Sequence, residues 1–149
     1  MSKRMNDQPL PLPSTEREIV DSLLARVQQL GENIIWAREA RSHGRARTDV
    51  LLMRDAEVIT IEVKRSDWKR AVLQAVLNRY CADRSFIALW ASHVTDEVLE
   101  EAGRRGLGVL AVGPESLQVL GEAPIAQPDP AIRNRLLLQL PGVGTASIP

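Results

Sequence analysis

The chain has 149 residues, of which 44% are hydrophobic, so it can bury a core without disulfides or a structural metal, and one domain is expected. Its 19 basic and 19 acidic side chains give zero net charge, which argues against a protein that merely coats nucleic acid. The lone Cys81 excludes a disulfide framework and is expected to be a small core hydrophobe. No apolar run approaches the length of a membrane span and residues 1–13 lack a signal-peptide core, so a cytoplasmic protein is expected.

The N-terminal part is predicted to contain one helix and one short strand. Residues 1–13 are rich in proline and are expected to form a flexible segment. Apolar residues then recur at helical spacing from about Thr15 to Leu30, and Gly31 is expected to end that helix. A short strand from Asn33 to Ala37 and an arginine-rich loop from Arg38 to Arg47 are predicted to follow.

The next segment has the pattern of a β-hairpin. Two runs of β-branched and apolar residues, 48–53 and 57–64, flank the polar residues 54–56. A two-residue turn at Asp55-Ala56 would place Met53 opposite Val58. The same register would then extend along both strands.

This register would bring two carboxylates together. Asp49 would lie directly opposite Glu62, with their Cβ atoms roughly 5 Å apart, and side-chain alternation would place Lys64 on the same face as Glu62. Facing carboxylates repel each other, so the arrangement predicts a hard divalent cation with oxygen ligands between them. The alternatives are a solvated strand end, or a longer turn that would break the pairing unless a bulge restored it.

The remaining half is predicted to alternate helices and strands. In chain order, we expect a helix from Asp67 to about Ala82, a strand from Ser85 to Trp90, a helix from Thr95 to Arg105 closed by Gly106, strands over Leu107–Val112 and Leu117–Leu120, and a helix from Asp129 to Leu140. The fold class is therefore α/β, with a central mixed β-sheet flanked by helices. One domain would cover residues 14–140, with a flexible tail over residues 141–149.

Asp49, twelve intervening residues and Glu62-Val63-Lys64 resemble the core motif of the PD-(D/E)xK nuclease superfamily, which includes restriction endonucleases and Holliday junction resolvases. Thr48 stands where the name of the motif has proline. The resemblance implies a restriction endonuclease-like fold and a divalent-metal-dependent nuclease. Asp49, Glu62 and Lys64 would be its catalytic residues. The two carboxylates and the main-chain carbonyl of Val63 would hold Mg²⁺ or Mn²⁺.

Glu16 is a further candidate ligand. The segment Thr15–Leu23 resembles the first helix of archaeal Holliday junction resolvases, in which a glutamate contributes to the metal site, and Glu16 is the match. Helical periodicity places Glu16 on the face of the apolar stripe that begins at Ile19, where a carboxylate needs a partner. The alternative is an exposed first-turn glutamate favoured by the helix dipole, with Ser14 or Thr15 as the cap.

Basic residues gather on both sides of the motif, and eight of the 19 lie in two short windows there: Arg38, Arg41, Arg45, Arg47, Lys64, Arg65, Lys69 and Arg70. We expect four of them to contact phosphates, namely Arg45, Arg47, Arg65 and Lys69. The alternative is that individual arginines are solvated or pair with carboxylates.

Four other side chains have more than one interpretation. Gln74 follows the motif on a predicted helix, where related nucleases often place a polar residue near the metal, although a surface glutamine fits the pattern equally well. Aromatic residues total only 3%, so Trp36, Trp68 and Trp90 are predicted to be core or rim residues and not a base-stacking platform.

The sequence as a whole predicts a metal-dependent endonuclease that acts on DNA. One alternative is a nucleic-acid-binding or assembly module that retains the fold without turnover, and another is the nuclease subunit of a larger restriction or defence system. A chain of this length has little room for a separate target-recognition domain, so a homodimer is expected for double-strand cleavage.

Overall fold

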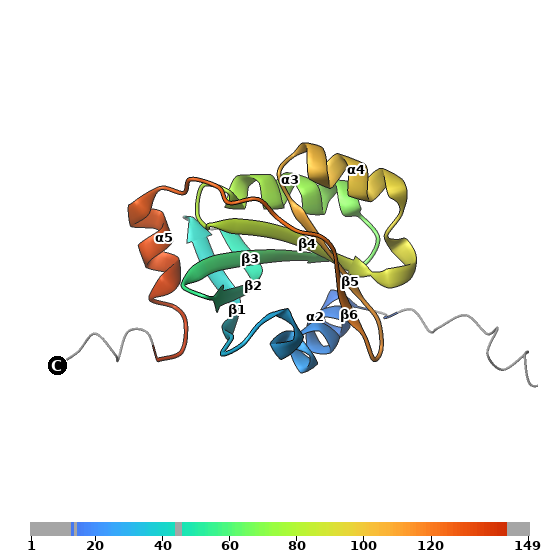
Figure 1. Cartoon of the computed structure of the whole chain (residues 1–149), viewed down its shortest axis with the longest axis horizontal. Coiled ribbons are helices and arrows are strands. Elements are labelled where there is room, and N and C mark those ends of the chain that lie inside the picture. Colours follow the sequence, from blue (N-terminus) through green and yellow to red (C-terminus); the bar gives the residue numbers. More distant parts are fainter. Residues whose placement is uncertain (1–12, 14, 44–45, 143–149) are drawn as a thin grey trace, which may run out of the picture.

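The computed structural model describes residues 13, 15–43 and 46–142, which form a sheet with helices on both faces (Figure 1). The helices are α2 (Glu16–Ala25), α3 (Trp68–Asn78), α4 (Asp96–Arg104) and α5 (Pro130–Leu137), with short 3-10 turns η1 (Val27–Leu30) and η2 (Ala91–His93). The strands are β1 (Ile35–His43), β2 (Ala46–Arg54), β3 (Glu57–Lys64), β4 (Arg84–Trp90), β5 (Gly108–Val112) and β6 (Leu117–Gly121).

The strands lie in the order β1-β2-β3-β4-β5-β6 in one six-stranded sheet. β3, β4 and β5 run parallel to one another, whereas the β1–β2, β2–β3 and β5–β6 pairs are antiparallel. α3 and α4 make the two crossovers between the parallel strands, and both cover the same face, as right-handed connections require. The α/β class with a mixed sheet and flanking helices is thereby confirmed.

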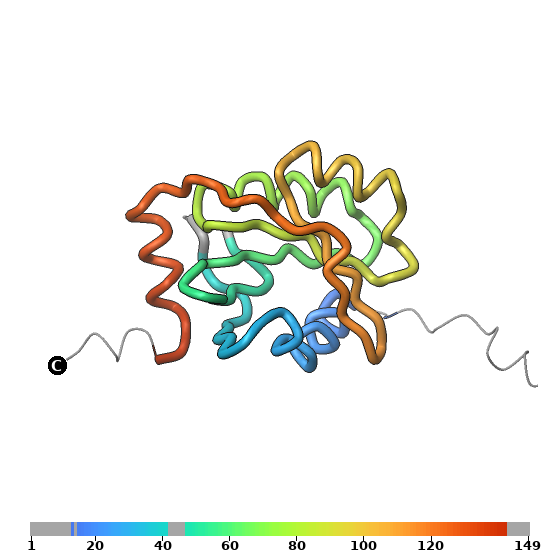
Figure 2. Tube along the Cα trace, viewed as in Figure 1, coloured from blue at the N-terminus to red at the C-terminus, as the bar shows by residue number. Residues whose placement is uncertain are grey.

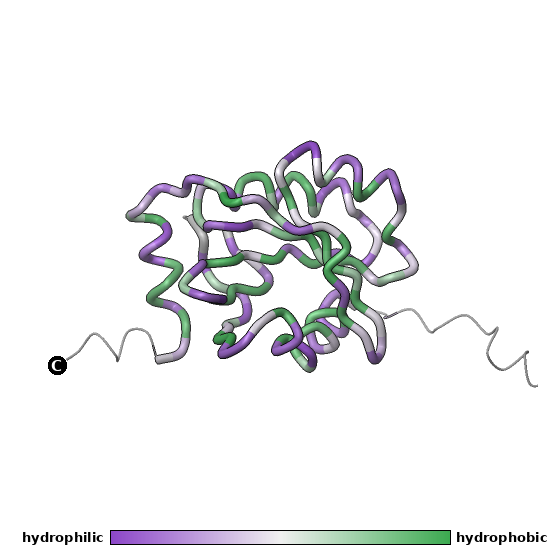
Figure 3. Tube along the Cα trace, in the orientation of Figure 1, coloured by the Kyte–Doolittle hydropathy of each residue, from purple (hydrophilic) through white to green (hydrophobic). Residues whose placement is uncertain are grey.

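Burial of apolar side chains on both faces of the sheet holds these layers together. One cluster joins the sheet to α2, a second joins it to α3 and α4, and a third joins β1, β2 and β3 to α5. Hydrophobic residues are concentrated in the sheet and alternate with hydrophilic ones along the helices (Figure 3). The helices are therefore amphipathic, and their apolar faces form the core with the strands.

The β2–β3 hairpin has the predicted register. Met53 pairs with Val58 and Val50 with Ile61. Asp55 and Ala56 have φ angles of 50° and 66°, as a two-residue type I′ turn requires at both central positions. The turn length predicted for this hairpin is confirmed.

The predicted arginine-rich loop over Arg38–Arg47 is wrong. β1 continues through most of it to His43, and β2 begins at Ala46, so the segment is a second antiparallel hairpin. The pattern of hydrophobic residues did not predict this part of β1, because its side chains are mostly polar. An edge strand tolerates polar residues, since one side of it faces solvent. Gln139 occupies part of that edge: its amide oxygen accepts from the Arg41 N–H and its amide nitrogen donates to the Arg41 carbonyl. In the chain trace, α5 lies beside this hairpin although it is distant in sequence (Figure 2).

The predicted helix starts are confirmed, but several predicted ends are too late. Side chains of Thr15, Asp67, Thr95 and Asp129 accept hydrogen bonds from first-turn N–H groups and cap α2, α3, α4 and α5. α2, α3 and α5 end at Ala25, Asn78 and Leu137, earlier than the predicted Leu30, Ala82 and Leu140. Irregular turns continue the hydrophobic spacing beyond each helix, so periodicity alone overestimates the length.

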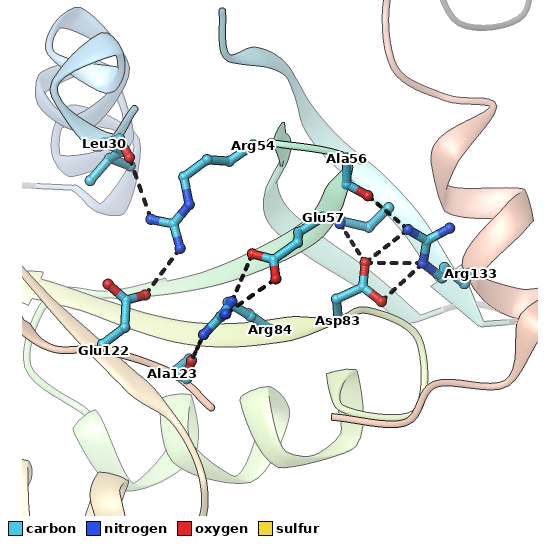
Figure 4. A network of polar contacts seen from close by, with 10 residues as sticks. Leu30, Arg54, Ala56, Glu57, Asp83, Arg84, Glu122, Ala123 and Arg133 are labelled. Atoms are coloured by element: carbon cyan, nitrogen blue, oxygen red, sulfur yellow. Dashed lines mark hydrogen bonds and ion pairs between the residues drawn. The ribbon is translucent and has the colours of Figure 1, made fainter. Parts of the chain in front are cut away.

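Arginine–carboxylate pairs join the strand ends around the β2–β3 turn (Figure 4). They connect residues that are distant in sequence, and the Arg133 guanidinium also donates to the main-chain carbonyl of Ala56 in the turn. The pairs are Arg54–Glu122 at 3.1 Å, Arg84–Glu57 at 2.8 Å and Arg133–Asp83 at 2.9 Å. This network lies at the start of β3, so it is separate from the motif at the end of that strand.

Candidate metal and nuclease site

The structure brings Asp49 and Glu62 together at the end of the β2–β3 hairpin. Val50 pairs with Ile61, so the next position along the same register sets Asp49 opposite Glu62. The Val63 N–H donates to Asp49 Oδ2 at 2.8 Å, which ties the aspartate to the β3 backbone. Glu62 interacts with Asp49 both by hydrogen bonding and by charge repulsion. The local geometry predicted for these two carboxylates is present.

Glu62 is a buried carboxylate with an unusual protonation equilibrium. Its residue is 2% exposed, and the Asn78 amide Nδ2 donates to Glu62 Oε1 at 2.8 Å. Burial, followed by the charge of Asp49, raises the pKa of Glu62 from 4.5 to about 8. The Asn78 hydrogen bond and the Lys64 charge act in the opposite direction and are outweighed. Two carboxylates held this way have a strong electrostatic reason to bind a cation or to share a proton.

Lys64 lies between the carboxylate pair and the start of α2. Its side chain is 17% exposed, and its Nζ lies 3.8 Å from Glu16 Oε1. Glu16 itself is an exposed first-turn residue, and Thr15 caps the helix by accepting from the Glu18 N–H. Glu16 therefore lies at the solvent-exposed edge of the apolar stripe of α2, and the expectation that its carboxylate is buried is wrong. The ion pair nevertheless brings Glu16 to the ammonium of the motif, and its role as a metal ligand stays a prediction.

Asn78 is the site residue that the sequence analysis missed. It occupies a buried position on α3, three and seven residues after the buried Ala75 and Ala71. A polar residue on an otherwise apolar helical stripe needs a polar partner. This pattern in the sequence could therefore have identified Asn78 as a residue of the site. Its partner is Glu62, which shows that α3 forms one wall of the site.

Gln74 lies on the same side of α3 as Asn78, one helical turn closer to the helix start. Its amide Oε1 is buried and has no hydrogen-bond partner within the part of the chain that the structure describes. α3 runs back along β3 from the end of that strand, so this turn lies nearer to Lys64 than Asn78 does. A buried oxygen without a protein partner suits an ordered water or a cation.

The donor atoms at this site suit a hard divalent cation. Asp49 and Glu62 offer carboxylate oxygen atoms, which Mg²⁺ and Mn²⁺ prefer over nitrogen and sulfur. Among the described residues, no group of three His, Cys, Asp or Glu side chains is assembled for a metal. A cation there would therefore rely on the two carboxylates with main-chain, amide or water oxygens, which is how Mg²⁺ is commonly held. The side chains at this site therefore suit Mg²⁺ or Mn²⁺.

The predicted phosphate-binding residues are only partly placed. Arg47 is exposed on β2 and Arg65 is exposed just after β3, whereas Arg45 lies outside the described residues. Lys69 lies with its Nζ 5.7 Å from the centre of the Trp68 ring. Arg38, by contrast, forms an ion pair with Asp21 at 2.7 Å. These positions are compatible with a basic rim on two sides of the carboxylates.

Two structural predictions outside the site are confirmed. Trp90 is buried, and Trp36 and Trp68 are partly buried against the core clusters. Cys81 is a buried free thiol whose pKa is raised by burial, so it behaves as a core residue. None of the helices in the described ranges is long and apolar enough to cross a membrane.

Comparison with known proteins gives a likeness in fold. No family model and no curated protein sequence matches the chain. The SPO1766 protein of unknown function from Silicibacter pomeroyi has a similar structure, with a TM-score of 0.63, 20% identity and coverage of 93% of this chain and 90% of that one. SfsA from Pyrococcus furiosus, solved in complex with Ca²⁺, has a TM-score of 0.41, 21% identity and coverage of 73% of this chain and 61% of that one. The first likeness shows a shared fold, and the second is too weak to carry an argument.

Proposed function

We propose that this chain is a divalent-metal-dependent nuclease that hydrolyses phosphodiester bonds in DNA, with a restriction endonuclease-like fold. The observation that carries the proposal is the facing pair of Asp49 and Glu62, with Lys64 two residues further along the same strand. The Val63 N–H fixes Asp49 and the Asn78 amide fixes Glu62, so both carboxylates are held in place before any ligand arrives. Such preorganised charge is characteristic of sites that stabilise a transition state.

Each residue has a distinct role in this proposal. Asp49, Glu62 and the main-chain carbonyl of Val63 would hold Mg²⁺ or Mn²⁺, and Glu16 would reach the ion directly or through water. The ion would supply Lewis acidity and lower the pKa of a bound water. The Lys64 ammonium would orient the attacking water and stabilise negative charge that develops on the phosphate oxygens. Glu16 lies beside Lys64, where it also holds the ammonium in place.

The proposal is tested by metal-dependent cleavage of linear duplex, branched and single-stranded DNA and of RNA. We expect cleavage of DNA with Mg²⁺ or Mn²⁺, and Asp49→Asn should abolish it and weaken Mn²⁺ binding in a calorimetric titration. The amide removes one negative charge from the pair while preserving the size of the side chain.

Asp55→Asn is the matched control, because it makes the same change in the exposed turn of the same hairpin. Asparagine is well suited to the positive φ of that turn, so this variant should cut and bind Mn²⁺ like the wild type. Unchanged Mn²⁺ affinity in Asp49→Asn would refute the assignment of this metal site. DNA binding without cleavage under any metal condition would favour the non-catalytic module.

The exposed basic residues near the motif should govern the salt dependence of DNA binding. Replacing Arg47 and Arg65 together with glutamine is expected to weaken binding about equally for all sequences and to reduce the slope of log K against log salt by roughly one unit per lost phosphate contact. Fluorescence anisotropy in Ca²⁺ at several salt concentrations measures this slope.

Arg104→Gln on α4 is the control, since Arg104 is exposed but forms its ion pair with Glu101 away from the motif. If the slope of log K against log salt were unaltered in the double variant, DNA would have to bind to another surface of the protein. Lys69→Gln should be measured separately, because the Lys69 ammonium also contacts the Trp68 ring, with its Nζ 5.7 Å from the ring centre.

A further inference from the structure

The outer face of α3 carries a row of exposed apolar side chains. Leu73, Leu77 and Tyr80 are 59%, 64% and 66% exposed, and their spacing of four and three residues aligns them along one side of the helix and the turn after it. Scattered exposed leucines are ordinary, but a continuous row of this kind marks a contact surface.

This row borders a groove between α3 and α4. A cavity of about 320 Å³ lies there, lined by Trp68, Lys69, Val72 and Leu73 from α3 and by Glu97, Glu101 and Arg105 from α4. Leu73 belongs to both the row and the groove, so the two form one surface, which we call the α3–α4 face. It is apolar at its centre and charged along its borders.

The charges on this face are divided between the two helices. α3 carries Lys69 and Arg70 in its first turn, and there is no acidic residue from 68 to 82. The first turns of α4 carry Asp96, Glu97 and Glu100. Within the part of the chain described by the structure, none of these five side chains has an ion-pair partner. A basic end and an acidic end therefore lie side by side, and within the described ranges their charges form no ion pairs.

The direction of the helices decides how a second copy fits. α3 follows β3 and α4 follows β4, and those strands are parallel, so the two helices run the same way and start at the same end of the sheet. A two-fold axis along the helices would place each α3 on the other copy's α4, with basic and acidic first turns at the same level. A two-fold axis across the helices would stack α3 on α3 and bring together two helices without a single acidic residue.

We propose that two copies of this chain form a dimer through the α3–α4 face, related by a two-fold axis parallel to the helices. Leu73 from both copies lies near the axis, and Lys69 of one copy faces Glu97 of the other. Such an isologous contact closes on itself and uses the same surface twice. The apolar row provides the contact area, and the charges favour this orientation over the one in which α3 stacks on α3. The inference concerns assembly and is independent of the proposed nuclease activity.

Sedimentation equilibrium of the full chain tests the assembly. Wild type should approach twice the monomer mass of 16.5 kDa at micromolar concentration. Leu73→Glu combined with Leu77→Glu should give a monomer, and its circular dichroism should be unchanged because both side chains are exposed. Leu138→Glu is the control, since Leu138 is a similarly exposed leucine (53%) at the end of α5, a helix that contacts β1 and β3, and it should leave the dimer intact. A monomeric wild type, or a dimeric double variant, would overturn the proposal.

A charge exchange tests the orientation. Lys69→Glu alone and Glu97→Lys alone should each raise the dimer dissociation constant about three- to tenfold, since two symmetric surface pairs become repulsive. The combined variant should restore wild-type affinity, and raising the salt concentration should weaken the wild-type dimer. Tighter dimerisation of Lys69→Glu would contradict the proposed axis, because that is the result expected when α3 stacks on α3. Absence of rescue in the combined variant would also overturn it.

Discussion

Glu62→Gln is expected to abolish metal-dependent cleavage while making the metal-free protein more stable at neutral pH. Because the pKa of Glu62 is raised to about 8, folding at pH 7 requires this carboxyl to take up a proton, whereas glutamine is neutral in both states. The glutamine oxygen still accepts the hydrogen bond from the Asn78 amide. Loss of a metal ligand eliminates turnover, whereas a side chain that needs no proton uptake on folding favours the folded state. Urea unfolding in EDTA at pH 7 should show a gain on the order of a few kcal/mol, as each pKa unit corresponds to about 1.4 kcal/mol.

The same residue should control how stability depends on pH. Burial and Asp49 raise the pKa of Glu62 to about 8 in the folded protein, against an ordinary value of 4.5. Between these values the folded state holds a proton that the unfolded state has released, so stability should fall as pH rises through this window and level off above it. Below the ordinary pKa, Glu62 is protonated in both the folded and the unfolded state, so it no longer makes stability depend on pH.

Unfolding free energies measured in EDTA from pH 4 to 9 test whether Glu62 controls the pH dependence of stability. The wild type should lose stability towards alkaline pH, and Glu62→Gln should flatten the profile. Glu115→Gln, in the exposed turn between β5 and β6, makes the same chemical change and should retain the wild-type slope. A Glu62→Gln protein that is less stable than wild type at pH 7, with an unchanged slope, would contradict the electrostatic account of the site.

Lys64→Ala is expected to lower turnover by about 10² to 10³ while changing Mn²⁺ affinity little. The ammonium shares a strand face with Glu62 but is not a metal ligand in the proposal, so its removal should act on the chemical step. Single-turnover cleavage with saturating metal and DNA measures the rate, and DNA affinity in Ca²⁺ reports binding without turnover. Equal cleavage rates in the two proteins would show that the catalytic assignment is wrong.

Glu16→Gln distinguishes a catalytic lysine from one that merely pairs with α2. Glu16 lies 3.8 Å from the Lys64 ammonium, so its amide variant weakens that ion pair while leaving the lysine present. If Lys64 acted only through this contact, both variants would lose the same activity. We expect Glu16→Gln to retain more activity at saturating metal than Lys64→Ala, and to lower Mn²⁺ affinity where the lysine variant does not.

The sequence by itself determined the features that depend on neighbouring residues. The two-residue turn at Asp55-Ala56 and the alternation of β3 predicted the register that sets Asp49 against Glu62, since turn length and pleat are local properties. The capping residues were readable for the same reason: a cap such as Asp129 bonds to N–H groups within the next three residues.

Only the tertiary structure decided the features that depend on what lies across the sheet. β1 extends to His43 because β2 pairs with it, and no local pattern in its polar residues indicated this. The raised pKa of Glu62 and its bond to Asn78 arise because α3 folds back over β3 and removes water from the carboxylate. The Lys64–Glu16 contact likewise requires α2 to reach the end of β3. Burial and long-range pairing are properties of the assembled layers, so the protonation and the walls of the site follow from packing and not from spacing along the chain.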